Sequence, residues 1–169
     1  IPYVVPPGIE RERDFSNYSG DTRQNEQSLA VNVKRLRDGY GRAAYRTTFN
    51  DFRSYRRMEM FIHAEGDQLK DNEINAFIRI GSDNQDNYYE YDIPLKVTSP
   101  GSRDTYAIWP DQNKVDVELK MFHMDKAARN NAKWPITEPF IYSDGKNRIT
   151  VLGQPDLSKV RVYMVGVRN

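Results

Sequence analysis

Aromatic residues are the first candidates for chemistry in this sequence. Rigid rings on a β-rich domain can stack against sugars, and the candidates for that role are Tyr88, Tyr89, Trp109 and Trp134. The alternative is ordinary packing, in which Tyr88, Tyr89 and Tyr91 cover the two faces of one strand and Trp109 enters the core. Packing is the more frequent role of such rings, so a sugar site is the second interpretation.

A polar loop at residues 83–87, Asp-Asn-Gln-Asp-Asn, is a weaker candidate for a metal site. Calcium takes six or more oxygen ligands, and Asp83 and Asp86 would supply the carboxylates. The loop lacks the glycine and glutamate positions of an EF-hand. Asn and Asp also favour turns because their side chains bond nearby backbone amides. We expect a turn without a metal, and a melting temperature that a chelator leaves unchanged.

Residues for catalysis are sparse. The chain has no cysteine and only two histidines, His63 and His123, and it has no G-x-S-x-G motif. Two carboxylates for glycoside hydrolysis need only meet in space, so choosing a pair among 24 acidic residues would be arbitrary. No glycine-rich phosphate loop is present. The sequence predicts a protein that is not an enzyme and holds no cofactor.

Composition narrows the classes of function that the protein could have. The 169 residues carry 25 basic and 24 acidic side chains, a net charge of +1, which argues against a nucleic-acid partner. No apolar run approaches the roughly 18–20 residues of a membrane helix. Aromatics make up 12% of the chain and favour strands. Both ends look cut from a longer protein, which is an expectation from the sequence alone.

Alternating apolar residues predict about eight strands with turn signals at short intervals, which is typical of an antiparallel β-sandwich. The clearest central strand is expected at residues 57–64. From residue 113 onward a strand and a helix both fit the pattern, and a helix over 114–129 is the choice because residues 122–131 contain no β-branched side chain. The other expected strands begin at residue 28 and near residues 43–49, 75–81, 88–93, 140–142, 148–151 and 160–167.

The first 28 residues differ from the rest, because they are polar and rich in proline at their start. They predict an extended arm (1–28) that packs on a single sandwich domain (29–169). Tyr3 to Val5 are expected to add an edge strand, which Pro6-Pro7 would end because proline cannot donate to a β-ladder.

Several runs together resemble one segment of the SprA (Sov) family, in order and over nearly the whole chain: YVVPPGIERERD at 3–14, LRDGYGRAAY at 36–45, DFRSYRR at 51–57, FIHAEG at 61–66, NYYEY at 87–91, DGKNRITV at 144–151, PDLS at 155–158 and VGVRN at 165–169. The family comprises giant outer-membrane proteins of the type IX secretion system, which are tied to gliding motility. The resemblance implies a segment outside the lipid, on either side of the outer membrane of the bacterial cell envelope. It carries no catalytic motif.

Two functions follow from these observations. The first is a non-catalytic structural and interaction domain of the translocon, whose partners are other domains of the same chain, secretion-system proteins or cargo. The second is a carbohydrate-binding jelly-roll module. The latter is suggested by analogy of architecture with galactose-binding-like domains, in strands 57–64, 75–81 and 88–93 followed by Trp109, and fold alone does not imply function.

Overall fold

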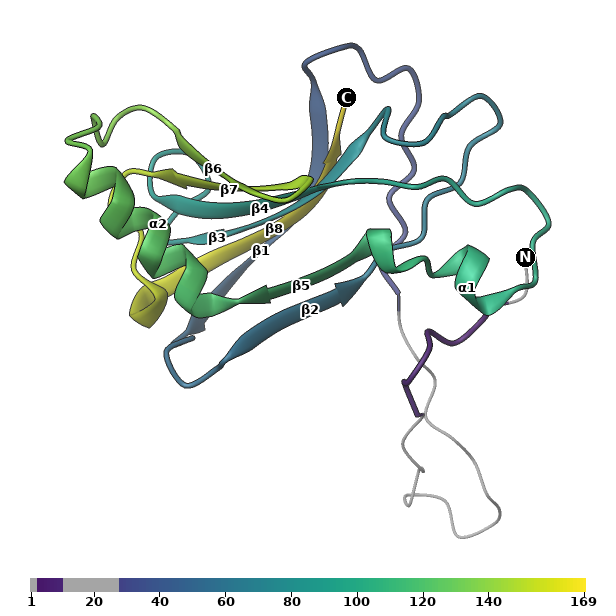
Figure 1. The fold of residues 1–169 in the computed structure, drawn as a ribbon, viewed down its shortest axis with the longest axis horizontal. Coiled ribbons are helices and arrows are strands. Elements are labelled where there is room, and N and C mark those ends of the chain that lie inside the picture. Colours follow the sequence, from purple (N-terminus) through teal and green to yellow (C-terminus); the bar gives the residue numbers. More distant parts are fainter. Residues whose placement is uncertain (1–2, 11–27) are drawn as a thin grey trace, which may run out of the picture.

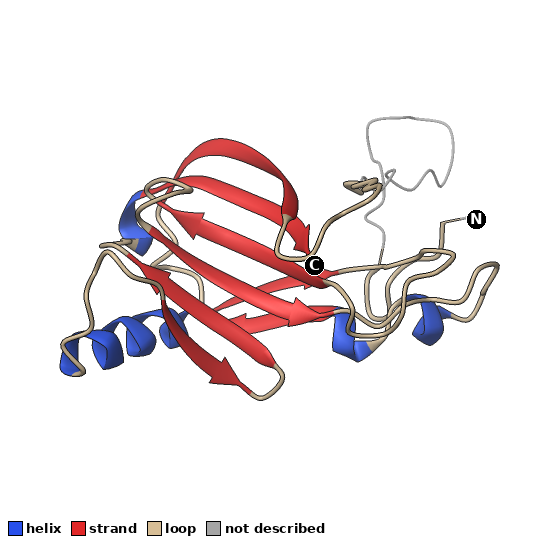
Figure 2. Cartoon of the chain, turned by 90° about the horizontal axis from the view of Figure 1, so that it is seen from above, coloured by secondary structure: helices blue, strands red, loops and turns tan. Residues whose placement is uncertain are grey.

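Two antiparallel β-sheets enclose the core of the protein, and a helix covers one end of it (Figures 1 and 2). The computed structural model describes residues 3–10 and 28–169. The larger sheet has six strands in the order β1-β8-β3-β4-β7-β6, and the smaller has two, β2-β5. The elements are β1 (Gly41–Asn50), β2 (Arg57–Phe61), β3 (Asn75–Gly81), β4 (Tyr88–Pro94), α1 (Thr105–Ile108), the 3-10 turn η1 (Asp111–Asn113), β5 (Lys114–Glu118), α2 (Leu119–Asn131), β6 (Phe140–Asp144), β7 (Asn147–Leu152), the 3-10 turn η2 (Leu157–Lys159) and β8 (Val160–Arg168).

The core lies between the inner face of the large sheet, the small sheet and α2. Strand β4 supplies Tyr89, Tyr91 and Ile93, which alternate toward this face as period-2 patterning requires. Most of the other buried core side chains come from β3, β5, β7, β8 and α2: Ala76, Ile80, Val115, Val117, Ile149, Val151, Val160, Leu119 and Phe122. The prediction of a mainly β, antiparallel sandwich is confirmed, whereas its jelly-roll, galactose-binding-like details stay a prediction.

The predicted helix at 114–129 was wrong in its first part. Residues 114–118 form β5, and the helix α2 runs from Leu119 to Asn131. Val115 and Val117 face the core and lie opposite Met60 and Met58 of β2. Helical and strand spacing overlap in this segment, and pairing with β2 selects the strand up to Glu118.

Strand β2 is not the central strand that was expected at 57–64. It spans five residues and belongs to the two-stranded sheet, while the middle of the large sheet is β3 and β4. The strand expected from residue 28 is also not found, because residues 28–34 belong to no strand and pair with no strand in the described part of the chain. Alternation therefore identified segments that can pair, and only the presence of a neighbouring strand decided which ones do.

The N-terminal edge strand predicted at Tyr3 to Val5 is likewise not formed. Residues 3–5 are not assigned to a strand, and the carbonyl of Val4 accepts a hydrogen bond from the indole N–H of Trp109 at 2.8 Å. The Tyr3 ring meets the same indole edge-on. The arm predicted for 1–28 is thus described only at residues 3–10 and 28, and the remainder of it lies outside the described residues.

The predicted hairpin near Asp144-Gly145 is confirmed. Strands β6 and β7 pair from Phe140↔Val151 to Asp144↔Asn147, and Gly145 has a φ of 64°, which glycine adopts at little cost. The strands predicted at 43–49, 75–81, 88–93 and 160–167 appear as β1, β3, β4 and β8.

Candidate functional site

The tyrosines proposed for sugar stacking are enclosed by protein. Tyr89 has no exposed surface, and its ring stacks on Phe122 of α2 with the centroids 5.2 Å apart. Burial raises the pKa of Tyr89 to about 12. Tyr88 lies on the opposite face of β4, where the Arg79 guanidinium covers its ring at 3.7 Å. These two rings therefore have no free face for a sugar.

The two tryptophans lie far from each other in the fold. Trp109 caps the C-terminus of α1 and contacts the rings of Phe61 and His63 edge-on. Trp134 follows α2, is 44% exposed and meets Phe140 edge-on. Figure 1 places α1 and the end of α2 at opposite ends of the molecule. The four candidate aromatics do not assemble into one stacking platform.

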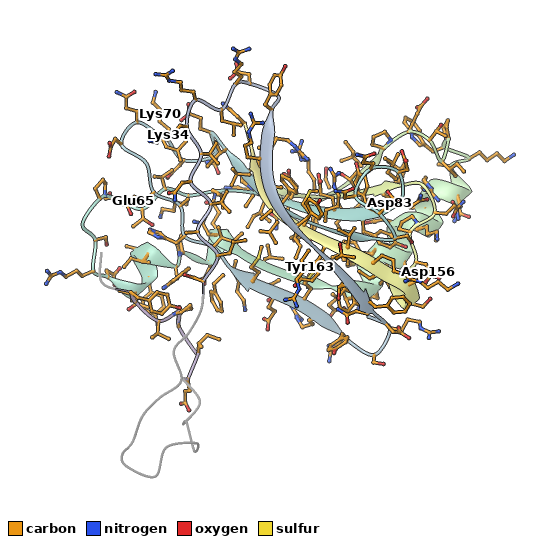
Figure 3. All side chains as sticks on the ribbon, turned by 180° about the vertical axis from the view of Figure 1, so that it is seen from behind. Lys34, Glu65, Lys70, Asp83, Asp156 and Tyr163 are labelled. Carbon is orange, nitrogen blue, oxygen red and sulfur yellow. The ribbon has the colours of Figure 1, made fainter. Side chains whose placement is uncertain are left out.

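The polar loop at 82–87 uses its own acidic residue to close the turn. One carboxylate oxygen of Asp83 accepts from the amides of Gln85, Asp86 and Asn87 at 2.6–3.0 Å, and the other accepts from the Asn87 side chain at 2.8 Å. Burial acts to raise the pKa of Asp83, but these hydrogen bonds together lower it to about 2. Figure 3 shows Asp83 at the same end of the molecule as Asp156. A turn explains these residue types without a metal, and over the described residues no three His, Asp or Glu side chains form a metal-binding group.

Neither histidine is paired for general-base chemistry. His63 packs on Trp109, and its Nε2 is buried with no hydrogen-bond partner among the described residues. His123 is exposed on α2. A catalytic imidazole needs both a substrate-facing nitrogen and a second nitrogen held by an orienting group. Over residues 3–10 and 28–169, neither histidine side chain makes a hydrogen bond to an orienting group.

A cluster of buried charges crosses the outer face of the large sheet. Glu90 and Asp92 on β4 are only 3% and 1% exposed. Arg168 at the end of β8 bridges both carboxylates at 2.9 and 3.1 Å. Arg79 of β3 binds Glu90 at 2.7 Å, and Arg148 of β7 binds Asp92 at 3.0 Å.

This charged cluster joins four neighbouring strands through their side chains. Each buried carboxylate has two arginine partners, so its charge is compensated as burial requires. The arginines have exposed parts, whereas the carboxylates lie beneath them. Because arginines from β3, β7 and β8 pair with both carboxylates of β4, the cluster braces the sheet.

Helix α2 carries two further cations, of which Arg129 is buried and Lys126 is half-buried. Arg129 has no exposed surface, and its guanidinium donates to the carbonyl of Gly153 and to the side chain of Asn130. Lys126 donates to the carbonyl of Pro155 at 2.8 Å. These cations fasten the helix to the loop after β7.

Asp125 differs from the cations of α2 because one of its carboxylate oxygens, Oδ2, has no hydrogen-bond partner among the described residues. The residue is 3% exposed. Burial, with a smaller contribution from the charge of Asp144, raises the pKa of Asp125 to about 6. The Asp144 carboxylate is itself held by the Tyr91 hydroxyl, which donates to it at 3.0 Å.

Sequence reasoning missed these buried charges for a definable reason. The alternation Tyr-Glu-Tyr-Asp in β4 signals one aromatic face and one acidic face, and an acidic face is normally expected to meet water. Arginines that cover it come from β3, β7 and β8, far away in the sequence. The position of these arginines over the acidic face could be known only from the pairing of the strands.

Comparison with known proteins identifies the family of the chain. A family model described as SprA_N, motility related/secretion protein, matches residues 1–169. A search of curated proteins gave no match. Over the residues that the structure describes, no helix has the length and hydropathy to cross a membrane. Because the family model covers the whole chain, the protein belongs to the SprA_N family of motility-related and secretion proteins.

Proposed function

We propose that this chain is a non-catalytic structural and interaction domain of an outer-membrane translocon of the type IX secretion system, acting in protein export and gliding motility. Membership of a motility-related and secretion family supports the cellular role. The domain would act in the cell envelope, through contacts with other parts of its own chain, with secretion-system proteins or with cargo.

The observation that carries the non-catalytic role is the way in which acidic side chains are used. Glu90 and Asp92 are each held by two arginines, and Asp83 is saturated by its own loop. Asp125, the one carboxyl with a strongly raised pKa among the described residues, is buried against the sheet under α2. An acid that works on a substrate must be reached by it.

Asp125→Asn provides the experiment, because the substitution preserves shape and removes the only acid of the described residues whose pKa suits a general acid near neutrality. The purified chain should show no turnover of glycans or peptides, with or without the substitution. In cells, removing the domain should block secretion and gliding, whereas Asp125→Asn should leave both intact. Hydrolysis that is lost in Asp125→Asn would overturn the proposal.

A further inference from the structure

The edge strand β1 is unusual because side chains on both of its faces are exposed, although residues 29–34 line a surface hollow together with Arg42, Ala43 and Ala44. It spans ten residues, and nine of them are exposed. A strand of a sandwich normally buries one face, so its side chains alternate between core and solvent. Tyr45 is 66% exposed and Phe49 is 75% exposed, although both are large apolar side chains. This strand resembles one that is missing a neighbour.

The outer edge of β1 has no backbone partner within the described part of the chain. Its ladder runs only to β8, from Gly41↔Arg168 to Asn50↔Val160 with an irregularity after Thr47. Figure 3 views the sheet from the side on which β1 lies in front of β8. An open edge exposes a row of amide and carbonyl groups that can pair with another strand.

The opposite edge of the same sheet is built differently. Strand β6 has five residues and follows Pro139 directly, so its free edge is short and bounded by a residue that cannot donate. Strand β1 is twice as long and contains no proline. Proteins blunt the edges that must stay unpaired, and only β6 is blunted by length and proline.

The basic side chains on and near β1 indicate which kind of strand its open edge can bind. Residues 34–57 hold eight basic and two acidic side chains, whereas the whole chain has a net charge of only +1. Arg42, Ala44 and Arg46 lie on one face of β1. In the ladder with β8 they pair with Val167, Val165 and Tyr163, in that order. Among the described residues neither arginine has an ion-pair partner, although Arg56 and Arg57 nearby do.

We propose that the open edge of β1 binds an extended acidic peptide segment of a partner as an added β-strand, with acidic residues four positions apart opposite Arg42 and Arg46. Cross-strand neighbours on one face recur every second residue, so two acids facing these arginines flank one residue facing Ala44. The exposed ring of Tyr45 on the other face would take an apolar or β-branched neighbour. This inference rests on the proposed interaction role and names the class of partner.

A second copy of the chain is a poorer occupant. Antiparallel pairing of two β1 strands centred on Ala44 would place Arg42 of each copy opposite Arg46 of the other, and like charges directly opposite destabilise a sheet. The same arginines discourage neutral strands from aggregating on the edge. They therefore select for an acidic strand.

Two peptides of equal composition test the proposal. In Thr-Thr-Glu-Thr-Val-Thr-Glu-Thr-Thr both glutamates face one side of a strand, and in Thr-Thr-Thr-Glu-Glu-Val-Thr-Thr-Thr they face opposite sides. Fluorescence anisotropy with the full 169-residue chain should give binding about threefold to tenfold tighter for the first peptide. Hydrogen exchange should slow at residues 41–50 when that peptide is bound.

Charge reversal supplies the matched controls. Arg42→Glu with Arg46→Glu should weaken binding of the first peptide by about tenfold or more, whereas Arg103→Glu with Lys146→Glu, exposed residues away from β1, should not. The backbone amides of the bound peptide point alternately toward β1 and away from it. Methylating the amides that point toward β1 should abolish binding, whereas methylating those that point away should not. Equal binding of the two peptides, equal effects of the two charge reversals, or equal effects of both methylations would each overturn the proposal, as would a stable dimer through β1.

A cellular comparison separates this inference from the proposed function. If removal of the domain blocks secretion and Arg42→Glu with Arg46→Glu does the same, both stand. If only removal of the domain blocks secretion, the interaction role stands and the β1 edge is rejected as its site.

Discussion

Replacing Asp125 with asparagine should stabilise this protein at neutral pH, although it removes a native charged side chain. Asp125 lies on the buried side of α2, and its Oδ2 makes no hydrogen bond within the described residues. Burial and the nearby charge of Asp144 make ionisation unfavourable there, so the pKa rises from 3.8 to about 6. An asparagine side chain would fill the same space without carrying a charge.

The size of the effect follows from this pKa. Each tenfold change in proton affinity is worth about 1.4 kcal/mol, so ionised Asp125 would lower the free energy of unfolding by about 3 kcal/mol. Relaxation and water near the carboxyl reduce this cost, and a gain of about 2 kcal/mol is expected for Asp125→Asn at pH 7.5.

The sign of the pH dependence is also determined. The folded state binds the Asp125 proton more tightly than the unfolded state, because the folded pKa is the higher one. The contribution of the protonated group to stability is complete below about pH 4 and is lost as pH rises through about 6. The difference in stability between Asp125→Asn and the unmodified protein should therefore grow over that interval and then level off.

Urea unfolding between pH 4 and pH 8, followed by circular dichroism, measures this difference. Asp67→Asn is the control, because Asp67 is exposed and has no ion-pair partner among the described residues. The reasoning is refuted if Asp125→Asn is no more stable than the unmodified protein at pH 7.5, or if their difference does not change with pH.

Two further substitutions test the sheet and the N-terminal contact. Arg168→Met should lower the free energy of unfolding by about 2–3 kcal/mol, because it leaves the buried carboxylates of Glu90 and Asp92 with one arginine each. The control is Arg57→Met, which breaks exposed ion pairs and should change the free energy of unfolding in urea little. Equal effects of these two substitutions would contradict the bracing role of the cluster. Trp109→Phe keeps a ring but loses the indole hydrogen bond to the N-terminal segment, so limited proteolysis should cut within residues 3–10 faster than in the unmodified protein. An unchanged cleavage rate would mean that this bond does not hold the segment.

The sequence alone determined the class of the fold and most of the strands of the large sheet. Strands β3, β4, β7 and β8 carry alternating apolar side chains long enough to pack on a core, and such a pattern leaves little choice of structure. The Asp144-Gly145 turn likewise defines its hairpin locally, because Gly145 adopts a positive φ. Family membership was also indicated by runs spread along the chain and is confirmed over residues 1–169.

Tertiary structure decided what local pattern left open. Residues 114–118 fit a helix and a strand equally, and pairing with β2 settled the matter. Residues 28–34 alternate as a strand does, yet no strand among the described residues pairs with them. The exposed arginines of β1 and the covered carboxylates of β4 belong to similar alternating runs, and only their places at the edge and in the middle of the sheet distinguish them. Hydrogen bonding between strands and the burial of charge depend on partners distant in the sequence, so periodicity could not predict them.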